Sequence, residues 1–333
     1  MGLYLRHPAS LAHDTGPHPE NAERVRAIEA ALADREWLGL ELVEAPAATR
    51  DQLVRVHTPE HVGRIEEFCR NGGGMIDMDT VAVEASYEAA LRAAGGALEA
   101  VERMLGGEER LAFCGLRPPG HHAETARAMG FCLFNNVAVA VAHAIEECGA
   151  ERVLVLDWDV HHGNGTAEIF SASDRVVYTS IHQSPLYPGT GDADDLGTGA
   201  GEGYTVNLPV PPGADSDDFL SLVQNVVVPV AREHRPGLIA ISAGYDAHRA
   251  DPLAQCMVDT AAYADMAAST RDVAAELDAP VLVCLEGGYE LDALAASVVA
   301  TIGALADSYQ PRAAPPEPAE RYLDRVRSYW PRI

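Results

Sequence analysis

The sequence predicts an α/β fold in which a mostly parallel sheet lies between two layers of helices. Two observations predict this fold. Short runs of β-branched residues alternate along the chain with alanine-rich segments of helical length. Several of the short runs, such as VLVL at 153–156 and VLVCL at 281–285, are apolar without interruption, which is typical of strands buried on both faces.

The expected elements follow one another along the chain. We predict strands at residues 3–6, 111–116, 153–158, 176–181, 238–242 and 281–285, and a weaker one at 204–208. Helices are expected between them at residues 20–34, 84–105, 136–147, 217–234, 261–277 and 292–306. The pattern predicts one domain over residues 1–310, followed within 311–333 by a proline-rich linker and a short amphipathic helix.

Composition narrows the classes of function. The 333 residues carry 24 basic side chains, with no lysine among them, against 50 acidic ones, so the net charge is −26. Such a surface repels phosphate backbones and anionic membranes, so we expect no direct nucleic-acid partner and no membrane partner. The six cysteines form no Cys-x-x-Cys pair and no signal segment is visible, so we expect a reduced, cytoplasmic protein.

Polar clusters follow four of the predicted strands, where open parallel sheets bind ligands. They read RPPGHHAE, DWDVHHGNGT, SAGYDAH and EGGYE. Alternate residues of an extended chain face one side, so Asp157, Asp159 and His161 share a face. Two of them can ligate a metal ion while the third supports them, and Asp246 is the natural further ligand. The set suits Zn²⁺, Fe²⁺, Mn²⁺ or Co²⁺, whereas the alternative is a buried hydrogen-bonded cluster without a metal.

An adjacent histidine pair offers acid–base chemistry. His121 and His122 follow a Pro-Pro-Gly turn, and one imidazole could act as a general base while the other stabilises charge. Asp157 and Asn164 are available to orient the two rings.

A tyrosine offers an oxyanion donor. Tyr289 follows Gly287 and Gly288, and these glycines permit a tight turn or a close approach of backbone to substrate. The hydroxyl of Tyr289 could donate a hydrogen bond to a developing oxyanion. Taken by itself, Tyr289 is better interpreted as a residue that caps the start of a helix.

Together these strings resemble the zinc-dependent histone deacetylase family, and most closely its class II branch and the bacterial histone deacetylase-like amidohydrolases. The matching strings lie in the family's order over about residues 4–306: HPENAER, RPPGHHAE, AMGFCLFNNVAVA, LDWDVHHGNGT, HQSPLYPGTG, SAGYDAHRADPL and LEGGYELDAL. The resemblance implies the arginase–deacetylase fold, with a mostly parallel, eight-stranded sheet in a three-layer α/β/α domain.

The resemblance also assigns site residues. It implies one catalytic Zn²⁺, held by Asp159, His161 and Asp246. The residues that it assigns to catalysis are His121, His122, Asp157, Asn164 and Tyr289. The residues that it assigns to substrate binding are Gly130, Phe131, Tyr187, Leu253, Asp79, Arg24, Gly287 and Gly288. It implies structural K⁺ at two sites, the first formed by Asp157, Asp159, His161, Ser180 and Ile181, and the second by Phe170, Ser173, Val176 and Tyr204.

Within these sets the resemblance implies individual roles. Phe131 and Tyr187 would be aromatic walls of an acyl-lysine tunnel, Asp79 would hold the substrate backbone at the rim, and Arg24 would lie near an acetate pocket. Class I members carry Asp where this chain has Asn164, so the anionic support for its histidine partner is weaker here.

The implied activity is removal of acetyl groups from acetylated lysine side chains of proteins or peptides, by attack of an activated water with His122 as base. The main alternative is a deacetylase of the same family that acts on acetylpolyamines or other small acetylamines. A two-manganese ureohydrolase and a silent acyl-lysine reader are further alternatives. A homo-oligomer is compatible with the sequence, through a contact of the C-terminal tail with a partner subunit, although a tail packed on its own surface is favoured.

Overall fold

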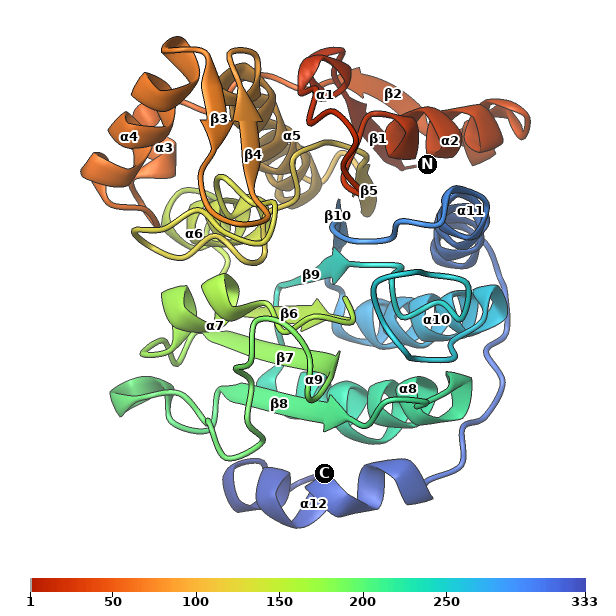
Figure 1. Cartoon of the computed structure of the whole chain (residues 1–333). Coiled ribbons are helices and arrows are strands. Elements are labelled where there is room, and N and C mark those ends of the chain that lie inside the picture. Colours follow the sequence, from red (N-terminus) through yellow and green to blue (C-terminus); the bar gives the residue numbers. More distant parts are fainter. Residues whose placement is uncertain (1) are drawn as a thin grey trace.

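A parallel sheet of eight strands forms the centre of the molecule. The computed structural model describes residues 2–333. The strands of this sheet are β1 (Leu3–Arg6), β2 (Glu41–Glu44), β5 (Leu111–Cys114), β6 (Val153–Asp157), β7 (Val176–Gln183), β8 (Thr205–Val210), β9 (Leu238–Ala243) and β10 (Val281–Leu285). Their order is β2-β1-β5-β10-β9-β6-β7-β8, and every neighbouring pair is parallel. The predicted α/β fold with an eight-stranded sheet is confirmed (Figure 1).

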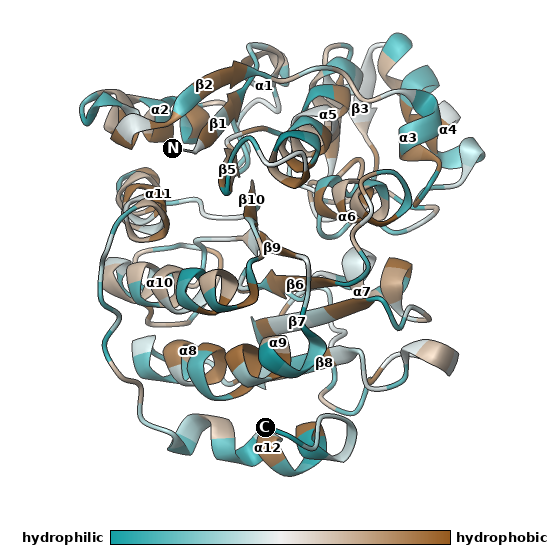
Figure 2. Ribbon diagram, turned by 180° about the vertical axis from the view of Figure 1, so that it is seen from behind, coloured by the Kyte–Doolittle hydropathy of each residue, from teal (hydrophilic) through white to brown (hydrophobic). Residues whose placement is uncertain are grey.

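Helices cover both faces of the sheet. One layer consists of α2 (Glu23–Ala33), α8 (Ser216–Leu222), α9 (Val228–His234), α10 (Thr260–Leu277) and α11 (Leu291–Ala306). The opposite layer consists of α4 (Pro59–Arg70), α5 (Ser86–Leu105), α6 (Asn136–Glu146) and α7 (Asn164–Phe170). Each layer forms a separate apolar core with one face of the strands, which are largely hydrophobic (Figure 2).

Several elements were not predicted, for identifiable reasons. Strand β2 lies at the sheet edge and is mostly exposed, so its sequence ELVE carries no buried apolar run. The hairpin of β3 (Gly73–Met75) and β4 (Val81–Val83) has only three residues in each strand. Helix α4 and the one-turn helices α1 (Ala9–Ala12) and α3 (Arg50–Leu53) were also missed.

Some predicted boundaries were wrong. The predicted helix at 217–234 is interrupted by a π-helical turn, η3 (Val223–Val227), between α8 and α9. Its residues Val223, Val226 and Val227 stay buried, so the apolar pattern continues through the turn and hides it. Strands β5 and β6 end before the predicted limits, which leaves Trp158 in the following loop.

The C-terminal segment packs on the body of the molecule. After α11 the chain runs along the outside to α12 (Glu317–Tyr329), which lies beside β8 and α8 (Figure 1). The side chains of Tyr322, Val326 and Trp330 are buried, and the Trp330 indole donates to the Gly203 carbonyl at 2.9 Å. The C-terminal helix therefore packs against its own chain. Among the described residues, no helix has the length and hydropathy that a membrane span requires.

Candidate active site

The polar clusters predicted at strand ends meet at one edge of the sheet. Strands β5, β10, β9 and β6 are consecutive neighbours and run in the same direction. Each cluster follows the carboxyl end of one of these strands. Residues far apart in the sequence therefore come together at the carboxyl edge, where parallel sheets place their ligand sites.

Two carboxylates and one imidazole converge in a group that could hold a metal ion. One ligand atom from each of Asp159, His161 and Asp246 lies within 4.8 Å of the others. The Nδ1 atom of His161 is 3.1 Å from Oδ1 of Asp159 and 3.1 Å from Oδ2 of Asp246. All three side chains are buried. The backbone N–H of Gly287 donates to Oδ2 of Asp159 at 2.8 Å, and a Cβ atom at this glycine would collide with the Asp246 carboxylate.

The first histidine of the pair is supported by a carboxylate. Nδ1 of His121 is 3.0 Å from Oδ2 of Asp157, which also accepts a hydrogen bond from the Tyr178 hydroxyl at 2.9 Å. Burial lowers the pKa of His121, but the carboxylates of Asp157, Asp159 and Glu286 outweigh burial and raise it to about 10. An imidazolium is therefore favoured at this position.

The second histidine is supported by an amide. Nδ1 of His122 is 2.8 Å from Oδ1 of Asn164. Burial, together with the neighbouring His121 and His161, holds the pKa of His122 well below its usual range. The two adjacent rings, whose centroids are 4.0 Å apart, thus differ in their preferred charge.

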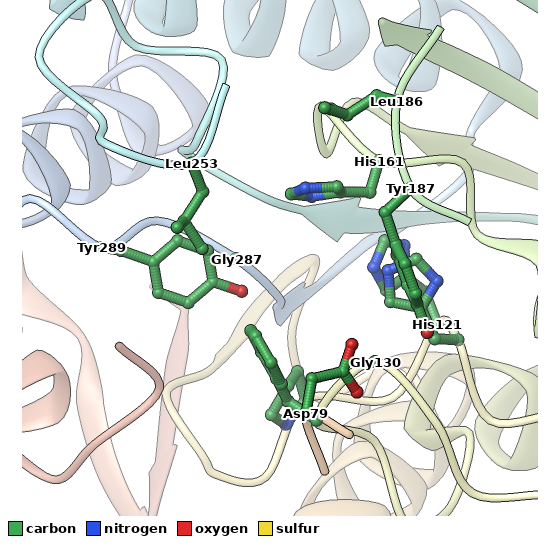
Figure 3. A pocket seen from close by; sticks show the side chains of 12 residues that line it. Asp79, His121, Gly130, His161, Leu186, Tyr187, Leu253, Gly287 and Tyr289 are labelled. Carbon is green, nitrogen blue, oxygen red and sulfur yellow. The ribbon is translucent and has the colours of Figure 1, made fainter. Parts of the chain in front are cut away.

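A pocket of about 210 Å³ opens above these groups. Tyr289 and Leu253 form one wall, His161 and Tyr187 lie opposite, and the Tyr289 hydroxyl points into the space between (Figure 3). Burial, reinforced by the Asp246 carboxylate, raises the pKa of Tyr289 well above its usual value, so the hydroxyl keeps its proton. The predicted residues that line the pocket are Asp79, His121, His122, Gly130, Phe131, His161, Tyr187, Leu253, Gly287 and Tyr289. Pro119 and Leu186 also line it and were missed, although both lie within strings that match the family.

The pocket has two chemically different ends. We call the buried end the floor; it consists of the lining residues His121, His122 and His161, together with the buried carboxylates that contact His121 and His161, which are Asp157, Asp159 and Asp246. We call the more exposed end the mouth; it consists of Asp79, Leu186 and Tyr187. Tyr187 is 37% exposed, whereas Asp157 and Asp246 are fully buried.

A strained turn presents one aromatic wall. Gly130 and Phe131 both have positive φ, +56° and +68°. A Cβ atom at Gly130 would collide with the His122 ring, so glycine is required there. The N–H of Phe131 donates to the Thr80 hydroxyl at 3.2 Å, which fastens the turn to the loop that carries Asp79.

The predicted internal arginine lies behind the pocket rather than in its lining. Nε of Arg24 donates to the Gly288 carbonyl at 2.6 Å, and its guanidinium lies 5.0 Å from the centre of the Tyr289 ring. The Glu20 carboxylate pairs with Arg24 at 3.1 Å and also with Arg117, and all three side chains are fully buried. Sequence reasoning missed this triad, although HPENAER and RPPGHHAE contain it.

The residues predicted to bind K⁺ occupy two places. The first set lies at and just beyond the carboxyl end of β6 and within neighbouring β7, where Asp157 and Ser180 are in register. The second set spans the end of α7, the start of β7 and the residue before β8. Both K⁺ sites stay a prediction.

Known proteins match most of this chain in sequence and in fold. The sequence pattern of the histone deacetylase domain matches residues 18–305. A probable deacetylase from Archaeoglobus fulgidus is 41% identical over 291 residues, covering 86% of this chain and 80% of that protein. A histone deacetylase-like amidohydrolase from Pseudomonas aeruginosa is 38% identical over 293 residues, covering 87% of this chain and 76% of that protein. The crystal structure of the HDA15 HD domain matches with a TM-score of 0.91 and 39% identity, covering 99% of this chain and 95% of that chain.

Proposed function

Because the chain belongs to the histone deacetylase family and is a deacetylase of that family, we propose that it removes acetyl groups from acetylated lysine side chains of proteins or peptides. We also propose that one Zn²⁺ assists this reaction. The observation that carries the proposal is the buried Asp159–His161–Asp246 group at the floor of a pocket with aromatic walls. A linear acyl-lysine fits such a pocket, because its reactive amide can reach the floor while its backbone stays at the mouth.

The chemistry of the floor fits a zinc ion. Asp159 and Asp246 place two fully buried carboxylates beside one imidazole, and a buried carboxylate is costly unless a cation balances it. One nitrogen and two oxygen donors form a set that suits Zn²⁺ and leaves a coordination position for substrate. When bound, such an ion polarises a carbonyl and lowers the pKa of water to about 7. Asp159, His161 and Asp246 would hold it.

The residues of the chain would then handle the protons. The amide oxygen of Asn164 can only accept, so the Nδ1 atom of His122 donates to it and Nε2 stays free to take a proton from the attacking water. The Tyr289 hydroxyl would donate to the oxyanion that develops on the acetyl carbonyl. The C–N bond then breaks, and the proton returns from the histidine pair to the leaving amine, so amide and water become acetate and free amine.

An acetylated polyamine is the second candidate substrate. The net charge of −26, together with Asp79 at the mouth and its neighbour Asp77, would attract a polycation of either kind. A protein or peptide is preferred, because Asp79 would hold a peptide backbone at the mouth.

A substrate panel on zinc-loaded protein tests this assignment. We expect acetate release from acetyl-lysine peptides with kcat/KM well above that for acetylputrescine and acetylspermidine. The reverse order would assign the protein to small acetylamines. No release of acetate from any acylated amine would contradict the proposed function itself.

A further inference from the structure

The glutamate that ends the RPPGHHAE string has no role in the chemistry described above. Glu124 lies two residues after His122, is half-buried, and does not line the pocket. Its Oε1 accepts a hydrogen bond from Nδ2 of Asn164 at 2.8 Å. The same amide group contacts His122 through its oxygen, so a chain of two hydrogen bonds connects the Glu124 carboxylate to the imidazole.

The surroundings of Asn164 fix which way its amide points. Its Nδ2 faces three acceptors: Oε1 of Glu124, the carbonyl oxygen of His122 at 3.5 Å and the sulfur of Met129 at 3.4 Å. A flipped amide would place its oxygen against all three. The carboxylate is the strongest of these acceptors, because charge-assisted hydrogen bonds are about twice as strong as neutral ones. Glu124 therefore contributes most to the preference for one orientation.

The amide orientation in turn decides the tautomer of His122. An amide oxygen can only accept a hydrogen bond, so Nδ1 of His122 must carry the proton, and Nε2 keeps its lone pair. With the amide flipped, the NH₂ group would face Nδ1 and favour the opposite tautomer, in which Nε2 carries the proton and cannot act as a base.

Glu124 is itself held in place by its backbone. Its N–H donates to the Arg127 carbonyl at 2.9 Å, and its carbonyl accepts a hydrogen bond from Nδ1 of His57 at 3.0 Å. These bonds fix the backbone of Glu124, so its carboxylate can hold the Asn164 amide in one orientation.

We propose that Glu124 is a positioning residue for the deacetylation, which holds the Asn164 amide so that His122 stays in the tautomer with a free Nε2. The inference rests on the proposed function, in which His122 is the base. Under this proposal, Glu124 also gives His122 an anionic support. The Glu124 carboxylate reaches His122 through the Asn164 amide, by two hydrogen bonds, whereas the Asp157 carboxylate contacts His121 directly.

The first test asks whether residue 124 must supply a hydrogen-bond acceptor or a negative charge. Glu124→Ala should lower kcat about 10–100-fold with little change in KM, which is the usual cost of removing a group that orients a catalytic side chain. Glu124→Gln keeps an acceptor oxygen, so most of kcat should return. Glu168→Ala is the matched control, because this exposed carboxylate accepts only from the neighbouring Thr125 N–H, at 3.0 Å, and kcat should not change. Equal zinc content in all variants is required, and a wild-type kcat in Glu124→Ala overturns the proposal.

The second test is rescue by Asn164→Asp. A carboxylate has no donor group, so it accepts from Nδ1 of His122 in any orientation and no longer needs Glu124. Asn164→Asp should therefore restore kcat in the Glu124→Ala background, yet lower it in the wild type, where two carboxylates would face each other. If the double variant is no more active than Glu124→Ala, the proposal fails.

The third test observes the imidazole without any turnover. NMR of the ring nitrogens in histidine-labelled protein, with His122→Ala used for assignment, should show a proton on Nδ1 in the wild type and a mixture of tautomers in Glu124→Ala. Identical spectra would overturn the inference. Failure of the proposed function is distinguishable, because the wild type would then release no acetate from any acylated amine, whereas the tautomer of His122 is read by NMR without turnover.

Discussion

The floor and the mouth of the pocket are built in different ways. The floor residues follow the carboxyl ends of adjacent central strands and are almost completely buried. The mouth lies on loops, where Tyr187 is 37% exposed and Met78, beside Asp79, is 97% exposed. The sheet therefore fixes the groups that would act on the amide bond, while loops present the groups that would select the substrate.

This difference has a consequence for substitutions. Changes at the floor should act on folding, metal binding or kcat, because the carboxylates and the Nδ1 atoms of the histidines there have defined hydrogen-bond partners. Changes at the mouth should act on KM and on the choice of substrate, because those side chains are partly hydrated and their partners are replaceable by water.

The largest effect on stability is expected behind the floor, at the Arg24–Glu20–Arg117 triad. Glu20→Gln leaves two buried guanidinium groups without their carboxylate, and breaking such a buried pair costs about 3–5 kcal/mol in the free energy of unfolding. Denaturant unfolding measures this loss. The control is Glu23→Gln, which removes an exposed pair with Arg26 and should cost well under about 1 kcal/mol.

The pH dependence of this effect follows from the pKa of Glu20. Burial raises that pKa, but Arg117 and Arg24 outweigh burial and lower it to about 2. The unfolded value is about 4.3. A depressed carboxyl pKa stabilises the fold above the unfolded value, and the contribution is lost as the pH falls toward about 2. The difference between wild type and variant should shrink over this window, and a constant difference would contradict the ion pair.

In the wall of the pocket, Tyr289→Phe should retain zinc and lose most of its turnover. Removing one oxyanion donor typically costs about 10²–10³ in kcat. The measurement is kcat on an acetyl-lysine peptide together with the zinc content, and Tyr329→Phe on the C-terminal helix is the control. Undiminished turnover in Tyr289→Phe would remove this tyrosine from the mechanism.

The floor was also the part of the site that the sequence predicted best. Its residues lie in strings that follow apolar strand runs, so both their chemistry and their common edge could be predicted, and the structure brings Asp159, His161 and Asp246 together. What the sequence could not predict are contacts between polar side chains of distant segments. Glu20 and Glu124 are ordinary glutamates in the sequence, and only the fold places them beside Arg117 and Asn164.

A smaller effect is expected at the mouth. Asp79→Asn should raise KM for peptide substrates about tenfold and leave kcat nearly unchanged, because a hydrogen bond to a charged group contributes about 1.5–3 kcal/mol. Met78→Ala is the matched control on the same loop. A loss of kcat without a change in KM would show that Asp79 acts on the chemistry, and the division between floor and mouth would then be wrong.

The smallest effect is expected from the overall charge. With a net charge of −26, kcat/KM for cationic acetyl-lysine peptides should fall several-fold when ionic strength rises from about 0.01 to about 0.15 M, as the screening length shrinks from about 30 to about 8 Å. Uncharged substrates are the control and should show little change. If cationic and neutral substrates respond equally, the acidic surface does not steer the substrate.

Metal removal and reconstitution test whether the Asp159–His161–Asp246 group holds one zinc ion on which deacetylation depends. Chelation should abolish acetate release, and about one equivalent of Zn²⁺ per chain should restore it. Asp246→Ala should bind no zinc and recover no activity, whereas Asp194→Ala, a carboxylate whose side chain is 86% exposed, should behave as wild type. Full activity of the chelated protein, a requirement for two ions, or full zinc occupancy in Asp246→Ala would contradict the account.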